Sequence, residues 1–153
     1  MKIMRFLRFY HLVFAIVALS TYASNELFPL HIRLGYTLTA IIAFRLLWGF
    51  LGGKQVNFAR FYPSFKGFSF KNALTHPFIN RAVLLGLLLS LLAAILTGFG
   101  LIYHYHFGVS RHMVKEIHEM GANLFIFFAI FHATYLLVFK FSFARFFLFL
   151  DKD

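Results

Sequence analysis

The sequence lacks cysteine altogether and has few charged residues. The absence of Cys excludes disulfides, thiolate-bound iron–sulfur clusters and covalent haem attachment through a C-x-x-C-H motif. Only 13% of the 153 residues are charged, and only 5 are Asp or Glu. Because 61% are hydrophobic, with a mean hydropathy of +0.77, a soluble domain of this length could not keep so much apolar surface away from water. The composition therefore predicts an integral membrane protein.

Four segments are long and apolar enough to cross a membrane. A spanning helix needs about 20 mostly apolar residues, and the qualifying segments lie near 3–23, 34–51, 82–103 and 120–139. They should be helices, because a backbone in lipid must satisfy its own hydrogen bonds. Four such helices use most of the chain. We therefore predict an all-α fold, a membrane-embedded four-helix bundle that forms a single domain over residues 1–153.

The net charge of +10 is unevenly distributed between the two sides of this predicted bundle. The loops remote from the termini contain only Arg33, Arg111 and Lys115, beside three glutamates. Because basic residues favour the cytoplasmic side, both termini should lie in the cytoplasm. We do not expect nucleic-acid binding, since the basic and aromatic segment 57–74 lies between two spans and fits lipid headgroups better. Eleven of the 15 basic residues lie on the side of the termini: Lys2, Arg5, Arg8, Lys54, Arg60, Lys66, Lys71, Arg81, Lys140, Arg145 and Lys152.

Histidines inside the predicted spans are the first functional candidates, because ionisable groups are costly in a membrane interior. His118 and His132 are 14 residues apart, which on one helix separates them by about 21 Å and keeps them within about 40° of the same face. His31 opens the second span at its outer end, whereas His11 lies about 18 Å inward from the outer end of the first. Depth therefore pairs His31 with His118 and His11 with His132.

Opposed histidine pairs between facing helices suit six-coordinate haem iron, because the porphyrin supplies the other four nitrogens. Neutral imidazole also binds zinc, copper and nickel, but a structural zinc site usually gathers four ligands in one place. The alternative for any single histidine is an ordinary core or interface residue. That alternative is stronger for His104 and His106, which follow the third span beside interfacial tyrosines.

Glycines and arginines near these histidines are candidates for haem packing and propionate binding. Gly35, Gly98 and Gly121 remove side-chain bulk where a flat macrocycle would approach the backbone, although small residues also allow membrane helices to pack closely. Arg45 lies at inner depth in the second span, where its cation could pair with a haem propionate or extend to the cytoplasmic interface. Arg33 is a candidate for the outer propionate.

The segment LHIRLGYTLTAIIAFRLLWGFLGG resembles the second helix of the bacterial cytochrome b-561 family. These are four-helix di-haem membrane cytochromes b, and the group includes relatives of the b-type subunits of nickel–iron hydrogenases. The family pattern of His, Gly, Arg and Trp-Gly reads in this sequence as His31, Gly35, Arg45, Trp48 and Gly49.

Two further segments carry the resemblance. The helix-four pattern reads as His118, followed by Glu, and His132. The helix-one pattern R-x-x-H-W reads as Arg8 and His11, with Leu in place of the Trp. The resemblance implies that the four histidines are axial ligands of two b-type haems, and it adds Arg8 to the propionate candidates.

The resemblance also implies a function. Such proteins transfer electrons across the bacterial inner membrane between the quinone pool and a second, often periplasmic, redox partner, in a larger membrane complex or as a homodimer. This would make the chain an oxidoreductase or an electron-transfer subunit. Some compact members oxidise superoxide and reduce quinone, and the basic residues Arg33, Arg111 and Lys115 could attract that anion. Alternatives of other classes are a histidine-using transporter of transition metals and a membrane anchor subunit without a cofactor.

Overall fold

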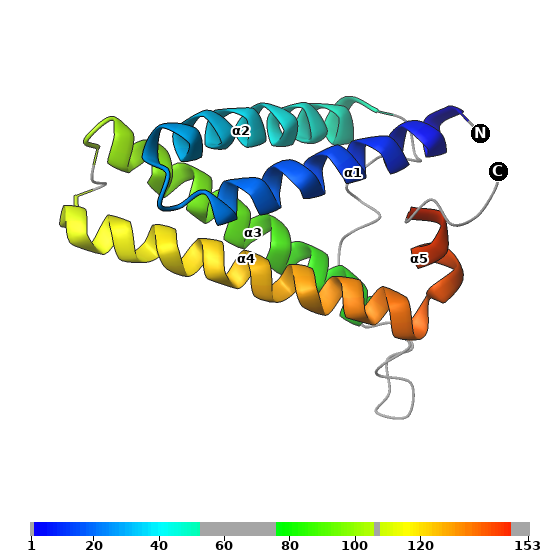
Figure 1. Ribbon diagram of the computed structural model, residues 1–153. Helices are drawn as coiled ribbons and strands as arrows, with labels where there is room; N and C mark the ends of the chain where they lie inside the picture. Colours follow the sequence, from blue (N-terminus) through cyan, green and yellow to red (C-terminus); the bar gives the residue numbers. More distant parts are fainter. Residues whose placement is uncertain (1, 53–75, 106–107, 148–153) are drawn as a thin grey trace. The chain divides into compact units, whose positions relative to one another are not determined.

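The protein is all-α throughout the described part of the chain, as predicted. The computed structural model describes residues 2–52, 76–105 and 108–147 (Figure 1). Its helices are α1 (Lys2–Ala23), α2 (Phe28–Leu51), α3 (Pro77–Ile102), α4 (Arg111–Phe139) and the short α5 (Phe141–Phe147). The first four are long and apolar enough to cross a membrane. The predicted interfacial segment 57–74 lies outside the described residues.

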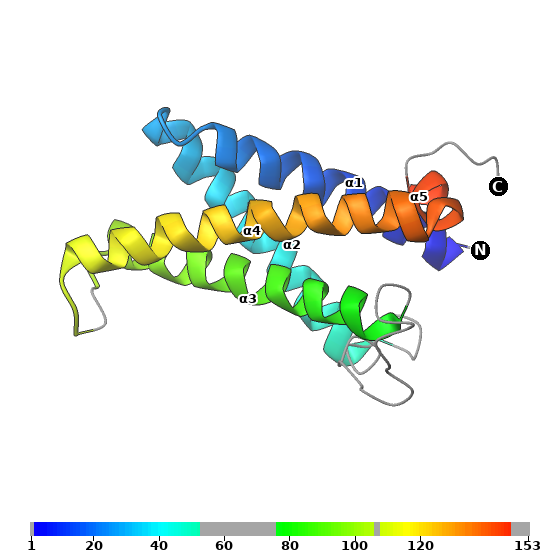
Figure 2. The same cartoon turned by 90° about the horizontal axis from the view of Figure 1, so that it is seen from below.

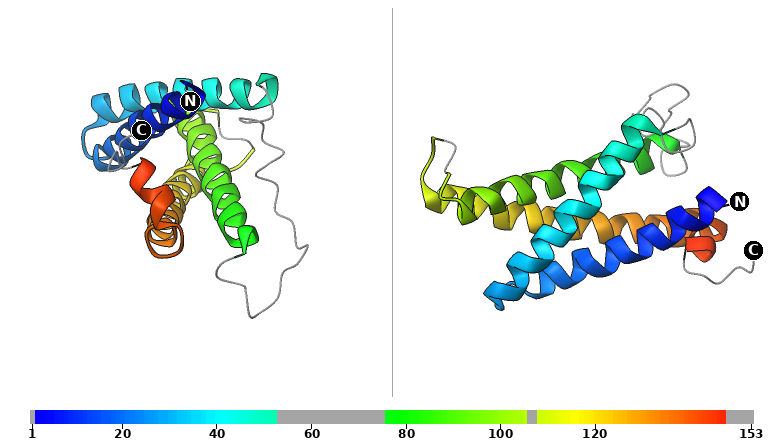
Figure 3. Two further views of the ribbon diagram at one scale, coloured as in Figure 1. Left: turned by 90° about the vertical axis from the view of Figure 1, so that its right-hand side faces the viewer. Right: turned by 90° about the horizontal axis from the view of Figure 1, so that it is seen from above.

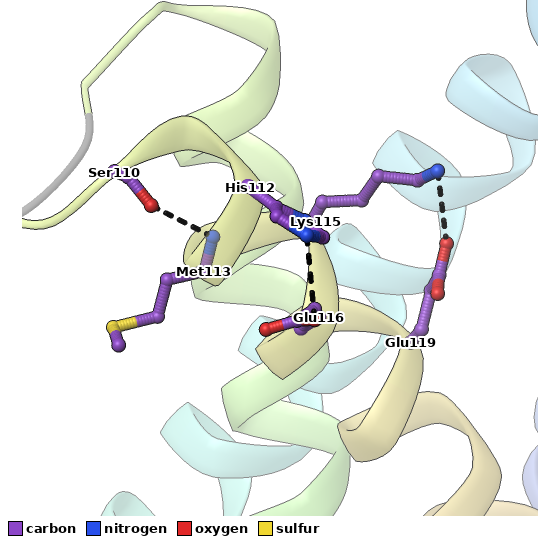
Figure 4. A network of polar contacts seen from close by, with 6 residues as sticks. All are labelled: Ser110, His112, Met113, Lys115, Glu116 and Glu119. Carbon is purple, nitrogen blue, oxygen red and sulfur yellow. Dashed lines mark hydrogen bonds and ion pairs between the residues drawn. The ribbon is translucent and has the colours of Figure 1, made fainter.

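Three of the four long helices begin earlier than their apolar segments suggest. α2, α3 and α4 begin at Phe28, Pro77 and Arg111, because a helix continues through polar turns that a hydropathy window excludes. Proline in the first turn of α2 and of α3 favours these starts, since proline is compatible with the first helical position. At α4 the side chain of Ser110 accepts a hydrogen bond from the backbone N–H of Met113 at 3.2 Å (Figure 4).

α4 is longer than a membrane requires. Its 29 residues give a length of about 44 Å, against a hydrocarbon core of about 30 Å. The charged residues of α4 all lie in its first three turns. The N-terminal end of α4 therefore extends beyond the apolar part of the bilayer.

The first hairpin consists of α1 and α2, and Figure 3 shows the short connection between them. Ser24 is buried in this connection and accepts a backbone hydrogen bond from Leu27 at 2.8 Å. Toward the other end of the two helices, the ring of Phe6 lies edge-on to Trp48 with 5.1 Å between ring centroids. The Tyr10 hydroxyl donates to the backbone carbonyl of Ile41 at 2.8 Å. Aromatic contacts therefore close the inner end of this hairpin.

The second hairpin consists of α3 and α4, which run antiparallel and side by side (Figure 2). Small residues set the separation of the two helices. A Cβ at position 121 would lie 3.1 Å from the carbonyl oxygen of Ser90 and 3.1 Å from the amide nitrogen of Ala94. A Cβ at position 86 would lie 2.8 Å from the ring of Phe128. Glycines thus allow α3 and α4 to approach closely at two levels.

Candidate functional site

His31 is oriented by the end of the neighbouring helix. It lies in the first turn of α2, and its Nδ1 is 2.9 Å from the carbonyl oxygen of Thr21, near the end of α1. The last carbonyls of a helix have no partner within the helix, so this oxygen is available to a side chain. Because a carbonyl oxygen only accepts, Nδ1 of His31 donates. In that neutral tautomer, Nε2 has the lone pair that can coordinate a metal.

His118 has the same arrangement in the second hairpin. Its Nδ1 donates to the carbonyl oxygen of Ala94 on α3 at 2.8 Å, so the lone pair is again on Nε2. The imidazole ring lies over Gly98, where a Cβ would be 3.1 Å from Cε1 and 3.4 Å from Nδ1. Gly98 is a predicted haem-packing residue, and the structure places it against the ring of the predicted ligand.

These two bonds hold each imidazole through one ring nitrogen, as metal-binding histidines in proteins usually are held. A hydrogen bond at one ring nitrogen fixes the tautomer and the ring orientation, and it raises the basicity of the other nitrogen. In both hairpins the acceptor is a main-chain oxygen of the preceding helix, Thr21 on α1 or Ala94 on α3. Both outer candidates are thus oriented to bind metal through Nε2.

The two inner candidates lie deeper in their helices. α4 is one continuous helix from Arg111 to Phe139, as the spacing argument for His118 and His132 requires. His132 is half-buried, and its Nδ1 is buried. His11 is exposed on α1.

Each predicted pair joins the two hairpins. His11 and His31 belong to the first hairpin, whereas His118 and His132 belong to the second. No pair therefore lies within one hairpin, and both pairings stay predictions. Within each hairpin, the described residues include no cluster of three or more His, Asp or Glu that could hold a metal ion. A single imidazole that can coordinate through Nε2 suits a metal whose other ligands belong to a cofactor, as the porphyrin nitrogens do for haem iron.

The three candidate arginines differ in environment. Arg8 on α1 is buried, with 6% of its surface exposed and its Nε buried. Arg45 is half-buried, and its guanidinium carbon lies 5.9 Å from the centroid of the Trp48 ring, a cation–π distance. Arg33 is exposed. Arg8 is therefore the most deeply buried of the three candidate arginines.

The candidate glycines also differ in their surroundings. No atom lies within 4 Å of a Cβ built at Gly35, so this part of α2 presents open backbone one turn after His31. A flat group could approach the helix there. Gly121, in contrast, lies against the backbone of α3, which is the helix-packing role that small residues have in membranes.

Charged residues at the outer end of α4 form exposed pairs (Figure 4). Nε2 of His112 lies 3.6 Å from the Glu116 carboxylate, and the Lys115 amine lies 3.5 Å from that of Glu119. Both pairs follow the i, i+4 spacing of helix-surface partners. Glu119 therefore reaches along the surface of α4 to Lys115.

Sequence reasoning missed the residues that support the imidazoles. Ser24 and Thr97 are buried hydroxyl residues, and each donates a hydrogen bond to the carbonyl that orients a histidine. Thr97 Oγ1 also lies 3.5 Å from Nδ1 of His118. No sequence signal distinguishes them, because Ser and Thr in membrane helices commonly bond their own backbone.

The resemblance of the sequence to a cytochrome family is confirmed by comparison with family models. Residues 3–147 match the family described as prokaryotic cytochrome b561. Comparisons with curated proteins and with solved structures found no match. The matched region contains all four candidate spans and both oriented histidines. The chain belongs to the prokaryotic cytochrome b561 family and is a multi-pass bacterial membrane protein, a b-type haem cytochrome of electron transfer.

Proposed function

We propose that this protein binds two b-type haems and transfers electrons across the bacterial inner membrane between the quinone pool and a periplasmic redox partner. The observation that carries the proposal is the matched orientation of His31 and His118, whose Nδ1 atoms donate to main-chain carbonyls at 2.9 and 2.8 Å. Bound haem would supply a one-electron couple between ferric and ferrous iron. The membrane topology with both termini in the cytoplasm is part of the proposal, and it rests on the positive-inside rule.

His31 and His118 would hold the outer haem through their Nε2 atoms, and His11 and His132 the inner one. Two axial imidazoles fill the iron's coordination sphere and leave no open position for oxygen, so the protein would carry electrons. On α4, 14 residues separate His118 and His132, so the two positions that would hold the haems lie about 21 Å apart along that helix.

Side chains around the haems would bind propionates and exclude water. Arg8 is the first candidate for an inner propionate because it is buried, and Arg45 is the second. Arg33 lies two residues after His31 and is the candidate for the outer haem. Gly35 leaves space for a porphyrin face on α2.

Superoxide oxidation coupled to quinone reduction is the alternative within the same family. It would draw on positive charge at the outer surface, where Arg111 and Lys115 are exposed. However, Glu116 and Glu119 lie on the same turns, and Glu119 is 3.5 Å from the Lys115 amine. This end of α4 therefore has no excess of positive charge, which gives little support to the attraction of superoxide.

Absorption spectra of the protein purified in detergent test the proposal. We expect a Soret band, a reducible α-band and two haems per chain. His31→Ala and His118→Ala should each remove the same haem, whereas His11→Ala and His132→Ala should remove the other. His112→Ala is the matched control, because this exposed histidine pairs with a glutamate and should leave both haems in place.

Three outcomes would contradict the proposal. A haem-to-protein ratio near one would show that one of the two proposed histidine pairs does not bind haem. The absence of a Soret band would exclude haem and leave the transporter and anchor alternatives. Failure both of quinol to reduce the protein and of quinone to oxidise the reduced protein in liposomes would exclude the quinone pool as its partner.

A further inference from the structure

The carbonyl oxygen that orients each outer histidine also accepts a hydrogen bond from the hydroxyl of the residue three positions later in the chain. In the first hairpin, the oxygen of Thr21 accepts from His31 Nδ1 at 2.9 Å and from Ser24 Oγ at 2.9 Å. In the second, the oxygen of Ala94 accepts from His118 Nδ1 at 2.8 Å and from Thr97 Oγ1 at 3.2 Å. The same three-part arrangement thus occurs in both hairpins.

The two hydroxyl residues are buried although they are polar. Ser24 is 4% exposed and Thr97 is 8% exposed. A hydroxyl is satisfied by any accessible carbonyl, and Thr97 has a second carbonyl within reach. Thr97 Oγ1 lies closest to the oxygen of Ala93, at 2.6 Å, and approaches Ala94 as a second acceptor. Ser90 on α3 bonds its own backbone in the same way, to Gly86 and Leu87. Ser24 and Thr97 differ from it because the oxygen that they approach also accepts from a histidine.

A second donor weakens the bond that the histidine makes. A carbonyl oxygen has two lone pairs, and a hydroxyl that binds one of them draws electron density from the oxygen and lowers its strength as an acceptor. Donation from Nδ1 gives the imidazole anionic character and makes Nε2 a stronger ligand. A hydroxyl on the shared carbonyl therefore makes the axial imidazole a weaker electron donor to iron, which favours the ferrous state.

We propose that Ser24 and Thr97 are positioning residues that raise the midpoint potential of the outer haem by sharing the carbonyl acceptors of its two axial histidines. The inference rests on the proposed function, because it takes His31 and His118 as ligands of that haem. Ser24 acts more strongly than Thr97, since its hydroxyl donates to the shared oxygen at the shorter distance.

The test is a redox titration of the detergent-purified protein with its haems bound. Ser24→Ala and Thr97→Val each remove one hydroxyl, and Val keeps the branched shape of Thr. We expect the midpoint potential of one haem to become more negative in both variants, with the larger shift in Ser24→Ala. The other haem should keep its potential. The electron paramagnetic resonance spectrum of the oxidised protein should change only in the signal of the shifted haem.

Two substitutions in the same hairpins serve as matched controls. Ser90 is also buried on α3, and its hydroxyl donates to the oxygen of Gly86 at 2.7 Å. Thr39 on α2 donates to the oxygen of Gly35 at 2.8 Å. Neither acceptor oxygen orients a candidate ligand. Ser90→Ala and Thr39→Val should leave both midpoint potentials unchanged.

The possible results separate the inference from the proposed function. Unchanged potentials in both Ser24→Ala and Thr97→Val, or shifts no larger than those of the controls, would overturn the inference. If His31→Ala keeps both haems, the proposed ligand set fails instead. Shifts of two different haems would support tuning by the hydroxyls and would overturn the pairing of His31 with His118.

Discussion

Replacing Gly121 by Ala tests how closely α3 and α4 must approach. The new methyl group would lie 3.1 Å from the oxygen of Ser90, 3.1 Å from the nitrogen of Ala94 and 3.4 Å from its Cα. All three atoms are backbone, so no side chain can rotate away. The two helices would have to separate by a few tenths of an ångström along a continuous interface.

The magnitude follows from two opposing effects. Overpacking of a closely packed interface costs about 1–3 kcal/mol, whereas Gly→Ala in a helix interior gains up to about 1 kcal/mol. The net loss of unfolding free energy should therefore be about 0–3 kcal/mol. Ala40→Gly, at an exposed position of α2, measures the propensity effect alone and should cost up to about 1 kcal/mol.

Equilibrium unfolding in mixed micelles of sodium dodecyl sulfate, followed by circular dichroism, measures both variants against the wild type. The loss of unfolding free energy in Ala40→Gly equals the propensity gain that offsets the packing cost in Gly121→Ala. The sum of the losses in the two variants is therefore the packing cost. A cost of about 1–3 kcal/mol corresponds to a change of about 5- to 140-fold in the folding equilibrium constant. Helix propensity alone would make Gly121→Ala more stable than the wild type by as much as Ala40→Gly is less stable. If Gly121→Ala shows this full gain, the close packing at Gly121 would be refuted.

Three smaller perturbations have definite expected outcomes in the same unfolding assay. Tyr10→Phe removes the hydroxyl that donates to Ile41 and should destabilise the first hairpin by about 1 kcal/mol; no change would mean that water replaces this bond. Ser110→Ala removes the N-cap of α4 and should cost about 1 kcal/mol, with Ser110→Thr retaining most of the stability. Lys115→Ala breaks an exposed pair with Glu119 and should cost less than about 0.5 kcal/mol, so a larger loss would place the pair in a structural role.

The spans were predictable because membrane insertion depends mainly on length and hydropathy. The helix boundaries were less predictable, because an apolar segment ends where charged residues begin. α4, in contrast, begins with nine residues of mixed polarity directly after its N-cap, Ser110. The short helix Phe141–Phe147 was missed as well. It follows the break at Lys140, where the backbone leaves the helical region, and its seven residues are too few for a periodic pattern.

The candidate ligands could be proposed from spacing, but their orientation could not. The spacing of His118 and His132 on one helix needs only the helical rise. The acceptors of His31 and His118 are main-chain atoms of other helices, and a main-chain atom has no signature in a sequence. The roles of Ser24 and Thr97 depend on those acceptors and were therefore equally hidden. That the two hairpins form a single domain stays a prediction.

Main-chain acceptors also determine which substitutions the protein tolerates around its ligands. Every residue type at position 21 or 94 supplies the same main-chain oxygen. Mutational scanning of these positions should therefore show few effects on haem binding, except for proline, which disrupts the helix. The hydroxyls of Ser24 and Thr97 are, by comparison, side chains that a single codon change can remove. The orientation of His31 and His118 should therefore be robust to mutation, whereas the proposed tuning by the two hydroxyls is open to gradual adjustment by selection or by design.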